Sequence, residues 1–160
     1  MDAATRTALT DILEGYEQRR DQELEARRAE QAGLERFLAD ATAALDSIVT
    51  PCFGQFAEEL KRHNHSCTIE SQKQDQDDKH SEVKVTLTIF PNGATLAQGN
   101  PSLSYTASAH RQKIAVHRSI TTRSGGFIPG SVGEFDLAQV TSGLVDRHLL
   151  ELAQSVFAQA

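Results

Sequence analysis

Two different periodicities of apolar and polar residues divide this chain into a helical part and a sheet part. From residue 5 to about residue 48 there is no proline, glycine occurs only twice, and strong helix formers dominate. In the second half of this stretch the apolar positions advance in alternating steps of four and three, which is typical of coiled coils; they are Leu34, Leu38, Ala41, Leu45, Ile48 and Cys52. The sequence therefore predicts one long N-terminal helix, a coiled-coil-like stalk over residues 1–48.

The apolar stripe on this helix is split into two groups. Between them the same positions carry charged or polar side chains, with Leu24 alone among them. A helix that is polar all round at mid-length is not the core helix of a single domain. We expect its C-terminal end to contact the domain and its N-terminal end to contact another subunit, as a homodimer. The expected oligomer interface is Leu9, Ile12, Leu13, Tyr16 and Leu24. The alternative is a free helical tail, which would leave these side chains exposed.

A second, shorter helix is predicted over residues 51–63. Proline breaks a preceding helical turn but suits the first position of a new helix, and Thr50 precedes Pro51 as a capping residue. The chain is therefore expected either to kink here or to turn a corner. This point also separates two expected units, the stalk over residues 1–48 and a small α+β domain over residues 49–160.

Strict alternation of apolar and polar residues predicts β-strands in the middle of the chain. Residues 82–90 alternate most clearly, with Val83 on one face and Lys84 on the other, and Pro91 to Gly93 end the strand with turn residues. Similar runs cover residues 102–109 and 113–123, and a less regular one passes through residues 67–69. Together they predict a four-stranded antiparallel meander over residues 66–123, apolar on one face and rich in serine and threonine on the other.

One apolar helical face near the end of the chain supplies the cover for this sheet. An amphipathic helix is predicted over residues 142–158, with His148 on its apolar face as a core residue. The predicted fold class is α+β: a long N-terminal helix, a four-stranded meander and a C-terminal helix packed on the sheet. Arg118 disturbs the pattern because alternation places it on the apolar face. Either a bulge near His117 corrects the phase or Arg118 reaches an acidic partner.

Composition narrows the class of protein. At 160 residues with 39 % hydrophobic residues, the chain has length for one domain plus an extended helix. No long uncharged apolar run could span a membrane, so no membrane partner is expected. The first residues lack the apolar core of a secretory signal, and two cysteines cannot build a disulfide framework. We therefore expect a cytoplasmic location.

Charge is distributed unevenly along the chain. Residues 83–133 contain no acidic residue and five basic ones, whereas the flanking segments are net acidic. Such a block indicates an anion-binding or partner-binding surface, or else it lies against the acidic helix of its own or a sister chain, which is the interpretation we favour. The candidate binding residues are Lys84, Arg111, Lys113, Arg118, Arg123, Phe127 and Ile128.

Two motifs are candidates for chemistry. His63, His65 and Cys67 would share one face of a strand, and imidazole plus thiolate suits zinc, but the spacing matches no established zinc pattern. Residues 124–133 contain four glycines without the lysine of a phosphate-binding loop, so they are expected to form a docking element or a flap. No nucleophile, base and orienting group assemble into a catalytic pattern, and no cofactor is expected.

These features predict a non-enzymatic, homo-oligomeric interaction or adaptor module. It would dimerise partly through the N-terminal helix and present its β-sheet to an unknown protein partner. The alternative is a nucleic-acid-associated protein that uses the basic block 83–133. Because the expected outer sheet face offers serine and threonine rather than stacking aromatics, nucleic acid is the less favoured partner.

Overall fold

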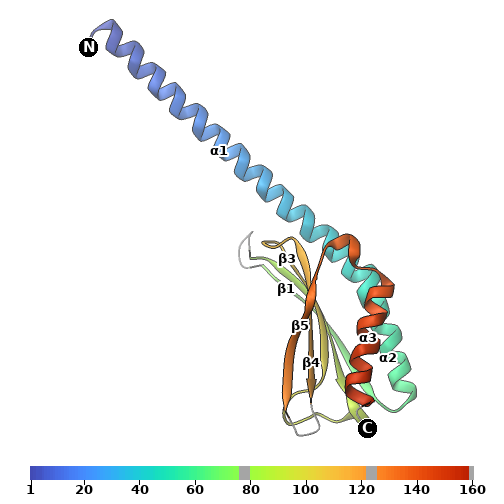
Figure 1. Cartoon of the computed structure of the whole chain (residues 1–160). Coiled ribbons are helices and arrows are strands. Elements are labelled where there is room, and N and C mark those ends of the chain that lie inside the picture. Colours follow the sequence, from blue (N-terminus) through green and yellow to red (C-terminus); the bar gives the residue numbers. More distant parts are fainter. Residues whose placement is uncertain (76–79, 122–125, 159–160) are drawn as a thin grey trace.

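A long helix projects from a small domain in which helices cover one face of a β-sheet (Figure 1). This computed structural model describes residues 1–75, 80–121 and 126–158. The helices are α1 (Ala3–Ala44), α2 (Thr50–Arg62) and α3 (Ser142–Phe157), with a π-helical turn η1 (Leu45–Val49) between the first two and short 3₁₀ turns η2 (Pro91–Gly93) and η3 (Leu137–Gln139). The strands are β1 (Ser66–Gln74), β2 (Glu82–Phe90), β3 (Ser102–Ser108), β4 (Lys113–Thr121) and β5 (Phe127–Phe135).

The predicted long N-terminal helix is present, and it reaches further than expected. Helical structure runs for 60 residues, from Ala3 to Arg62. It begins at Asp2, whose carboxylate accepts a hydrogen bond of 2.7 Å from the backbone N–H of Thr5, the arrangement of an N-cap. None of residues 1–33 is buried, and Leu34 is the first residue that is. The free part of α1 is therefore held by its own backbone hydrogen bonds, not by packing on the domain.

Pro51 bends the helix without ending it. Proline has no N–H to donate, and in a regular α-helix its ring would clash with the carbonyl four residues earlier. The preceding turn η1 is wider, and the backbone N–H of Thr50 bonds to the carbonyl of Leu45, five residues back. α2 then continues in a different direction from α1 (Figure 1). The chain was expected either to kink here or to turn a corner, and the structure shows the kink.

The sheet has five strands, so the prediction of four was wrong. They pair antiparallel in the order β1-β2-β3-β4-β5, and the sheet extends to Phe135 instead of ending at residue 123. The additional strand, β5, comes from the glycine-rich segment that was expected to form a docking loop or flap. Pro129 and Gly130 are unfavourable inside a central strand, but β5 pairs only with β4, and an edge position tolerates both residues.

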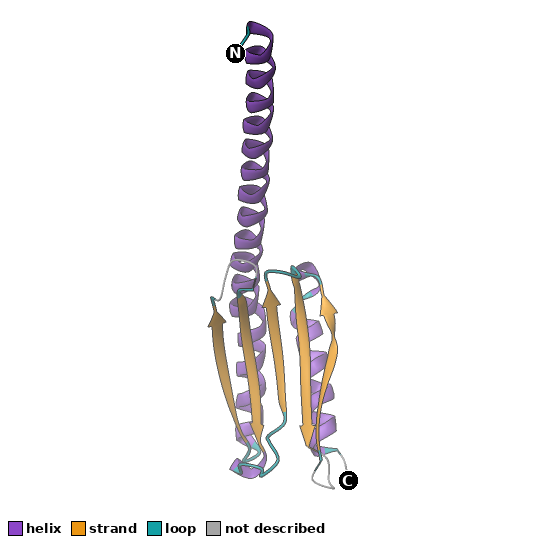
Figure 2. Cartoon of the chain, turned by 90° about the vertical axis from the view of Figure 1, so that its left-hand side faces the viewer, coloured by secondary structure: helices purple, strands orange, loops and turns teal. Residues whose placement is uncertain are grey.

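The core lies between one face of the sheet and the helices. Figure 2 shows α2, α3 and the base of α1 behind the sheet, with the other face uncovered. The inward residues of β2 are buried as predicted, and Phe53 from α2 and Leu152 from α3 are fully buried against this face. Ala41 and Leu45 of the helix base belong to the same core, and Leu34 is also buried. The expectation that the C-terminal end of the long helix contacts the domain is therefore confirmed.

Arg118 stays on the helix-covered face. The register between β4 and β5 shifts opposite Val116 and His117, but the extra residue, Val132, belongs to β5, so the alternation of β4 is unchanged. The guanidinium of Arg118 lies 3.5 Å from the carboxylate of Glu151 on α3. A bulge is thus present near His117, but it does not change the phase of β4 as one of the two expected alternatives required. The other alternative holds, because Arg118 is accommodated by its acidic partner Glu151.

Candidate interaction surfaces

Four apolar side chains near the N-terminal end of α1 form an exposed stripe that contacts nothing in the domain. We call Leu9, Ile12, Leu13 and Tyr16 the tip cluster. Ile12, Tyr16 and Leu13 are 65 %, 57 % and 52 % exposed, and Leu24 is also exposed further along the helix. Because the tip cluster lies far from the sheet (Figure 1), no rearrangement of the domain loops could cover it. The stripe is placed as the sequence predicted, while its role as an oligomer interface stays a prediction.

Most of the described basic candidates pair with acids of the same chain. Arg111 forms an ion pair with Glu134, and the ammonium of Lys113 lies 3.5 Å from the carboxylate of Asp136. Arg118 pairs with Glu151, as described above. In these three pairs the acids belong to the C-terminal block of the same chain, but they do not belong to the acidic N-terminal helix that the favoured interpretation named. The pairing weakens the case for a free cationic surface.

The uncovered face of the sheet carries small polar side chains. Thr86, Ser104 and His117 stand opposite one another across β2, β3 and β4, and Lys84 lies half-buried among their neighbours on this face. No helix covers this face of the sheet (Figure 2), and Thr86 on it is partly exposed, whereas Ser104 is buried. Arg123, the remaining basic candidate, lies outside the described residues.

Phe127 and Ile128 are exposed at the start of the edge strand β5. The ring of Phe127 leans on the loop after β2, because a Cβ added at Gly99 would lie only 3.2 Å from its Cε2 atom. Gly99 has a φ of +106°, a conformation that side chains other than glycine rarely adopt. The two apolar residues therefore lie on an edge strand, and Phe127 packs against the loop that contains Gly99. Residues 122–125 lie outside the described part of the chain.

The structure does not gather His63, His65 and Cys67 into a metal site. Nδ1 of His65 accepts a hydrogen bond of 2.9 Å from the backbone N–H of Asn92, and its ring packs on Phe157. Cys67 is half-buried, and burial raises the pKa of its thiol to about 11, which disfavours the thiolate that zinc requires. Among the described residues no group of three or more histidine, cysteine or acidic side chains could hold a metal ion.

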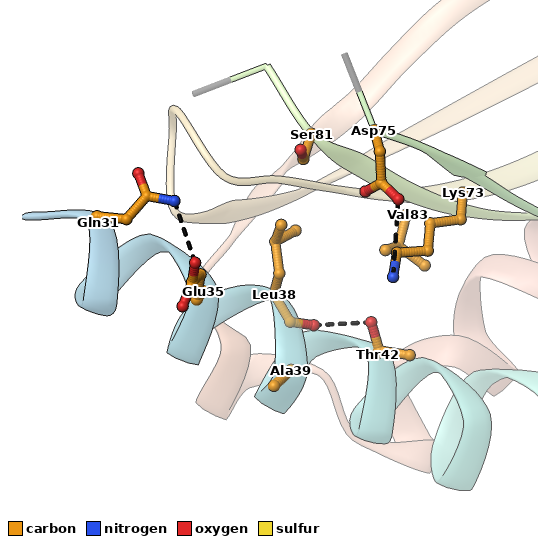
Figure 3. A pocket seen from close by; sticks show the side chains of 9 residues that line it. All are labelled: Gln31, Glu35, Leu38, Ala39, Thr42, Lys73, Asp75, Ser81 and Val83. Atoms are coloured by element: carbon orange, nitrogen blue, oxygen red, sulfur yellow. Dashed lines mark hydrogen bonds and ion pairs between the residues drawn. The ribbon is translucent and has the colours of Figure 1, made fainter. Parts of the chain in front are cut away.

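Two hollows, one between helix and sheet and one between two helices, were not anticipated from the sequence. One, of about 440 Å³, lies between the base of α1 and the strands β1 and β2 (Figure 3). Its polar groups pair with one another: Gln31 with Glu35 at 3.1 Å, and Lys73 with Asp75 at 4.0 Å. The described residues that line it include no histidine or cysteine. The other, of about 280 Å³, lies between α2 and α3 and is bordered by the exposed Leu150.

A buried tyrosine and histidine connect the sheet to α3. The hydroxyl of Tyr105 lies 2.5 Å from Nδ1 of His148, and both side chains are almost completely buried. Phe53 packs edge-on against Tyr105, and Phe135 packs against His148. Burial raises the pKa of Tyr105 and lowers the pKa of His148, while Glu151 opposes the shift of the histidine. His148 is thus a hydrogen-bonded core residue, as predicted.

The stability of the fold should fall as the pH drops below about 6.5. Because the pKa of His148 is lower in the folded chain than its usual 6.5, the unfolded chain binds more protons below that pH, and protons favour unfolding. One such group contributes at most about 1.4 kcal/mol per pH unit. Urea unfolding between pH 7.5 and 5 should show this loss, and the slope should be smaller in His148→Gln. Equal slopes in the two proteins would contradict a depressed pKa at this site.

Comparisons of the chain with protein-family models, with curated proteins and with solved structures found no match. None of the described helices has both the length and the apolar character needed to cross a membrane.

Proposed function

We propose that this protein is a non-enzymatic interaction module that forms a homodimer partly through α1 and presents its sheet domain to a protein partner. The observation that carries the proposal is the tip cluster, four large apolar side chains exposed on a helix that projects from the domain. Exposed apolar residues in a contiguous stripe are typical of protein–protein contacts. Burying them against a second copy would remove this apolar surface from water, at about 25 cal/mol per Å².

The uncovered sheet face supports the second part of the proposal. It lies on the side of the sheet away from the helices, so dimerisation through α1 leaves it accessible (Figure 2). Its hydroxyl-rich surface suits a polar partner. The ion pairs of Arg111, Lys113 and Arg118 with acids of the same chain offset the positive charge that a phosphate backbone would need. These pairs favour a protein partner over nucleic acid.

Adding negative charge to the tip cluster should convert the dimer into a monomer. In the double variant Ile12→Asp/Leu13→Asp, two carboxylates would have to be buried at the interface, which costs several kcal/mol. We expect the dissociation constant to rise more than about 100-fold, measured by sedimentation equilibrium or light scattering.

The matched control adds the same charge to another face of the helix. Gln18→Asp/Gln22→Asp also introduces two carboxylates into the exposed part of α1 and should leave the dimer intact. The proposed interface is incorrect if the full chain is a monomer at micromolar concentration, or if both double variants dissociate equally.

A further inference from the structure

We infer that the two copies associate antiparallel, with the tip clusters overlapping and the sheet domains at opposite ends of the assembly. This inference rests on the proposed dimerisation through α1 and adds its geometry. It follows from the charged residues that flank the tip cluster and from the place where α1 meets the sheet. Both features are set by the sequence and the fold of one chain.

The stripe through the tip cluster continues along α1 in steps of four and three. Its positions are Asp2, Arg6, Leu9, Leu13, Tyr16, Arg20, Glu23, Arg27 and Glu30, before it reaches the buried Leu34. We call the first eight of these residues, Asp2 to Arg27, the seam. They alternate between the two core positions of a heptad, so they would face a partner helix in a coiled coil. The tip cluster supplies three of them, and the charged residues flank it on both sides.

In a parallel dimer every seam residue would face its own copy. Arg6, Arg20 and Arg27 would each meet an identical arginine, and Glu23 would meet an identical glutamate. Like charges facing each other at the centre of an interface cost several kcal/mol and act against that arrangement. The seam therefore carries four elements of repulsion against parallel pairing along the exposed part of α1.

In an antiparallel dimer the two kinds of core position face each other, and the charges become complementary. With the twofold axis beside Asp11, Leu9 would meet Leu13 of the partner subunit, and Ile12 would meet its own copy across the axis. Arg6 would face the ring of the partner subunit's Tyr16, a cation–π pair. Asp2 would face the guanidinium of the partner subunit's Arg20.

Other antiparallel registers suit the chain less well. A shift of one heptad in either direction places Leu9 opposite an arginine, Arg6 or Arg20 of the partner subunit. Two heptads in the direction of greater overlap bring the partner's first residues to Leu34, which is already buried within its own chain. The folded domain thus limits how far the two α1 helices can overlap. Within that limit, the contact between Leu9 and Leu13 of the partner subunit selects one register.

The test measures a distance between identical positions in the full-length dimer. Glu25 is exposed, lies off the seam, and is 14 residues from the proposed axis, so its two copies would be about 42 Å apart along the helices at 1.5 Å per residue. A nitroxide label at Glu25→Cys, in a Cys52→Ala/Cys67→Ala background, allows this distance to be measured by pulsed electron resonance. A distance near 42 Å is expected.

The other outcomes separate this inference from the proposed function. A labelled dimer with a distance below about 25 Å, close to the width of two helices, would be parallel and would overturn the inference alone. A distance near 32 Å would correspond to the next heptad and would overturn the pairing of Leu9 with Leu13. A monomer in light scattering, for the unlabelled wild-type chain, would overturn the proposed function itself.

A charge reversal provides a second test that needs no label. Arg20→Glu would place a carboxylate opposite Asp2 twice in the antiparallel dimer, so the dissociation constant should rise about three- to tenfold at low ionic strength. In a parallel dimer the two copies of residue 20 face each other, so the change replaces two facing arginines with two facing glutamates and leaves the dissociation constant unchanged. An unchanged dissociation constant would therefore contradict the inference. Arg28→Glu, off the seam and beyond the overlap, is the matched control and should have no effect in either case.

Discussion

A chain that begins at residue 31 is expected to be a monomer with an intact sheet domain. None of residues 1–33 is buried, so the removal of residues 1–30 should change the free energy of unfolding of the domain by less than about 1 kcal/mol. It also removes the whole tip cluster and therefore the proposed interface. Light scattering gives the assembly state, and urea unfolding gives the stability.

A longer truncation is the control for this experiment. A chain that begins at residue 42 also lacks Leu34 and Ala41, which are buried. Their loss should cost several kcal/mol, because large buried apolar side chains contribute about 2–5 kcal/mol each and a small one such as alanine contributes less. If the chain that begins at residue 31 keeps the oligomeric state of the full protein, the interface lies in the domain and not on α1.

Phe53→Ala should destabilise the domain more than any change on the exposed part of α1. Phe53 is fully buried and packs edge-on against Tyr105, with ring centroids 5.9 Å apart. Truncation of such a ring costs about 3–5 kcal/mol, a large part of the 5–15 kcal/mol of a typical domain. Urea unfolding at neutral pH measures the difference.

Phe157→Ala serves as the comparison for Phe53. Its ring is partly exposed near the end of α3 and contacts His65, so we expect a cost of about 1 kcal/mol or less. A similar, small cost for both variants would mean that α2 does not pack on the sheet as described. A large cost for Phe53 alone would confirm that α2 joins the long helix to the core.

Elements with a regular apolar period could be predicted from the sequence, and those without one could not. β2 alternates strictly between apolar and polar residues, and α3 has one continuous apolar face, so both appear where expected. β5 has no such pattern, because Pro129, Gly130 and Gly133 interrupt it. Its hydrogen bonds to β4, a tertiary contact, make it a strand. Local preference was overridden there by pairing.

Among the candidate surfaces, too, some features could be predicted from a local pattern and others depend on the fold. The tip cluster was identifiable because its helical spacing is visible in the sequence. The pairing of Arg111 with Glu134, and of Arg118 with Glu151, depends on the sheet register and on where α3 packs, which no local pattern encodes. His148 was correctly assigned to the core, but its partner Tyr105 lies 43 positions away and could be identified only from the folded chain.

The π-helical turn before Pro51 also sets which way the two halves of the long helix face. Seven residues make nearly two full turns of an α-helix, so Leu34 and Ala41 share one side, and so do Phe53 and Leu60. Leu45 and Phe53 are eight residues apart, which in a regular helix would rotate the second pair by about 80° away from the sheet. The wide turn absorbs the extra residue, and all of these side chains are buried. The single surplus residue thus acts as a phase correction that lets one helix line the core on both sides of its bend.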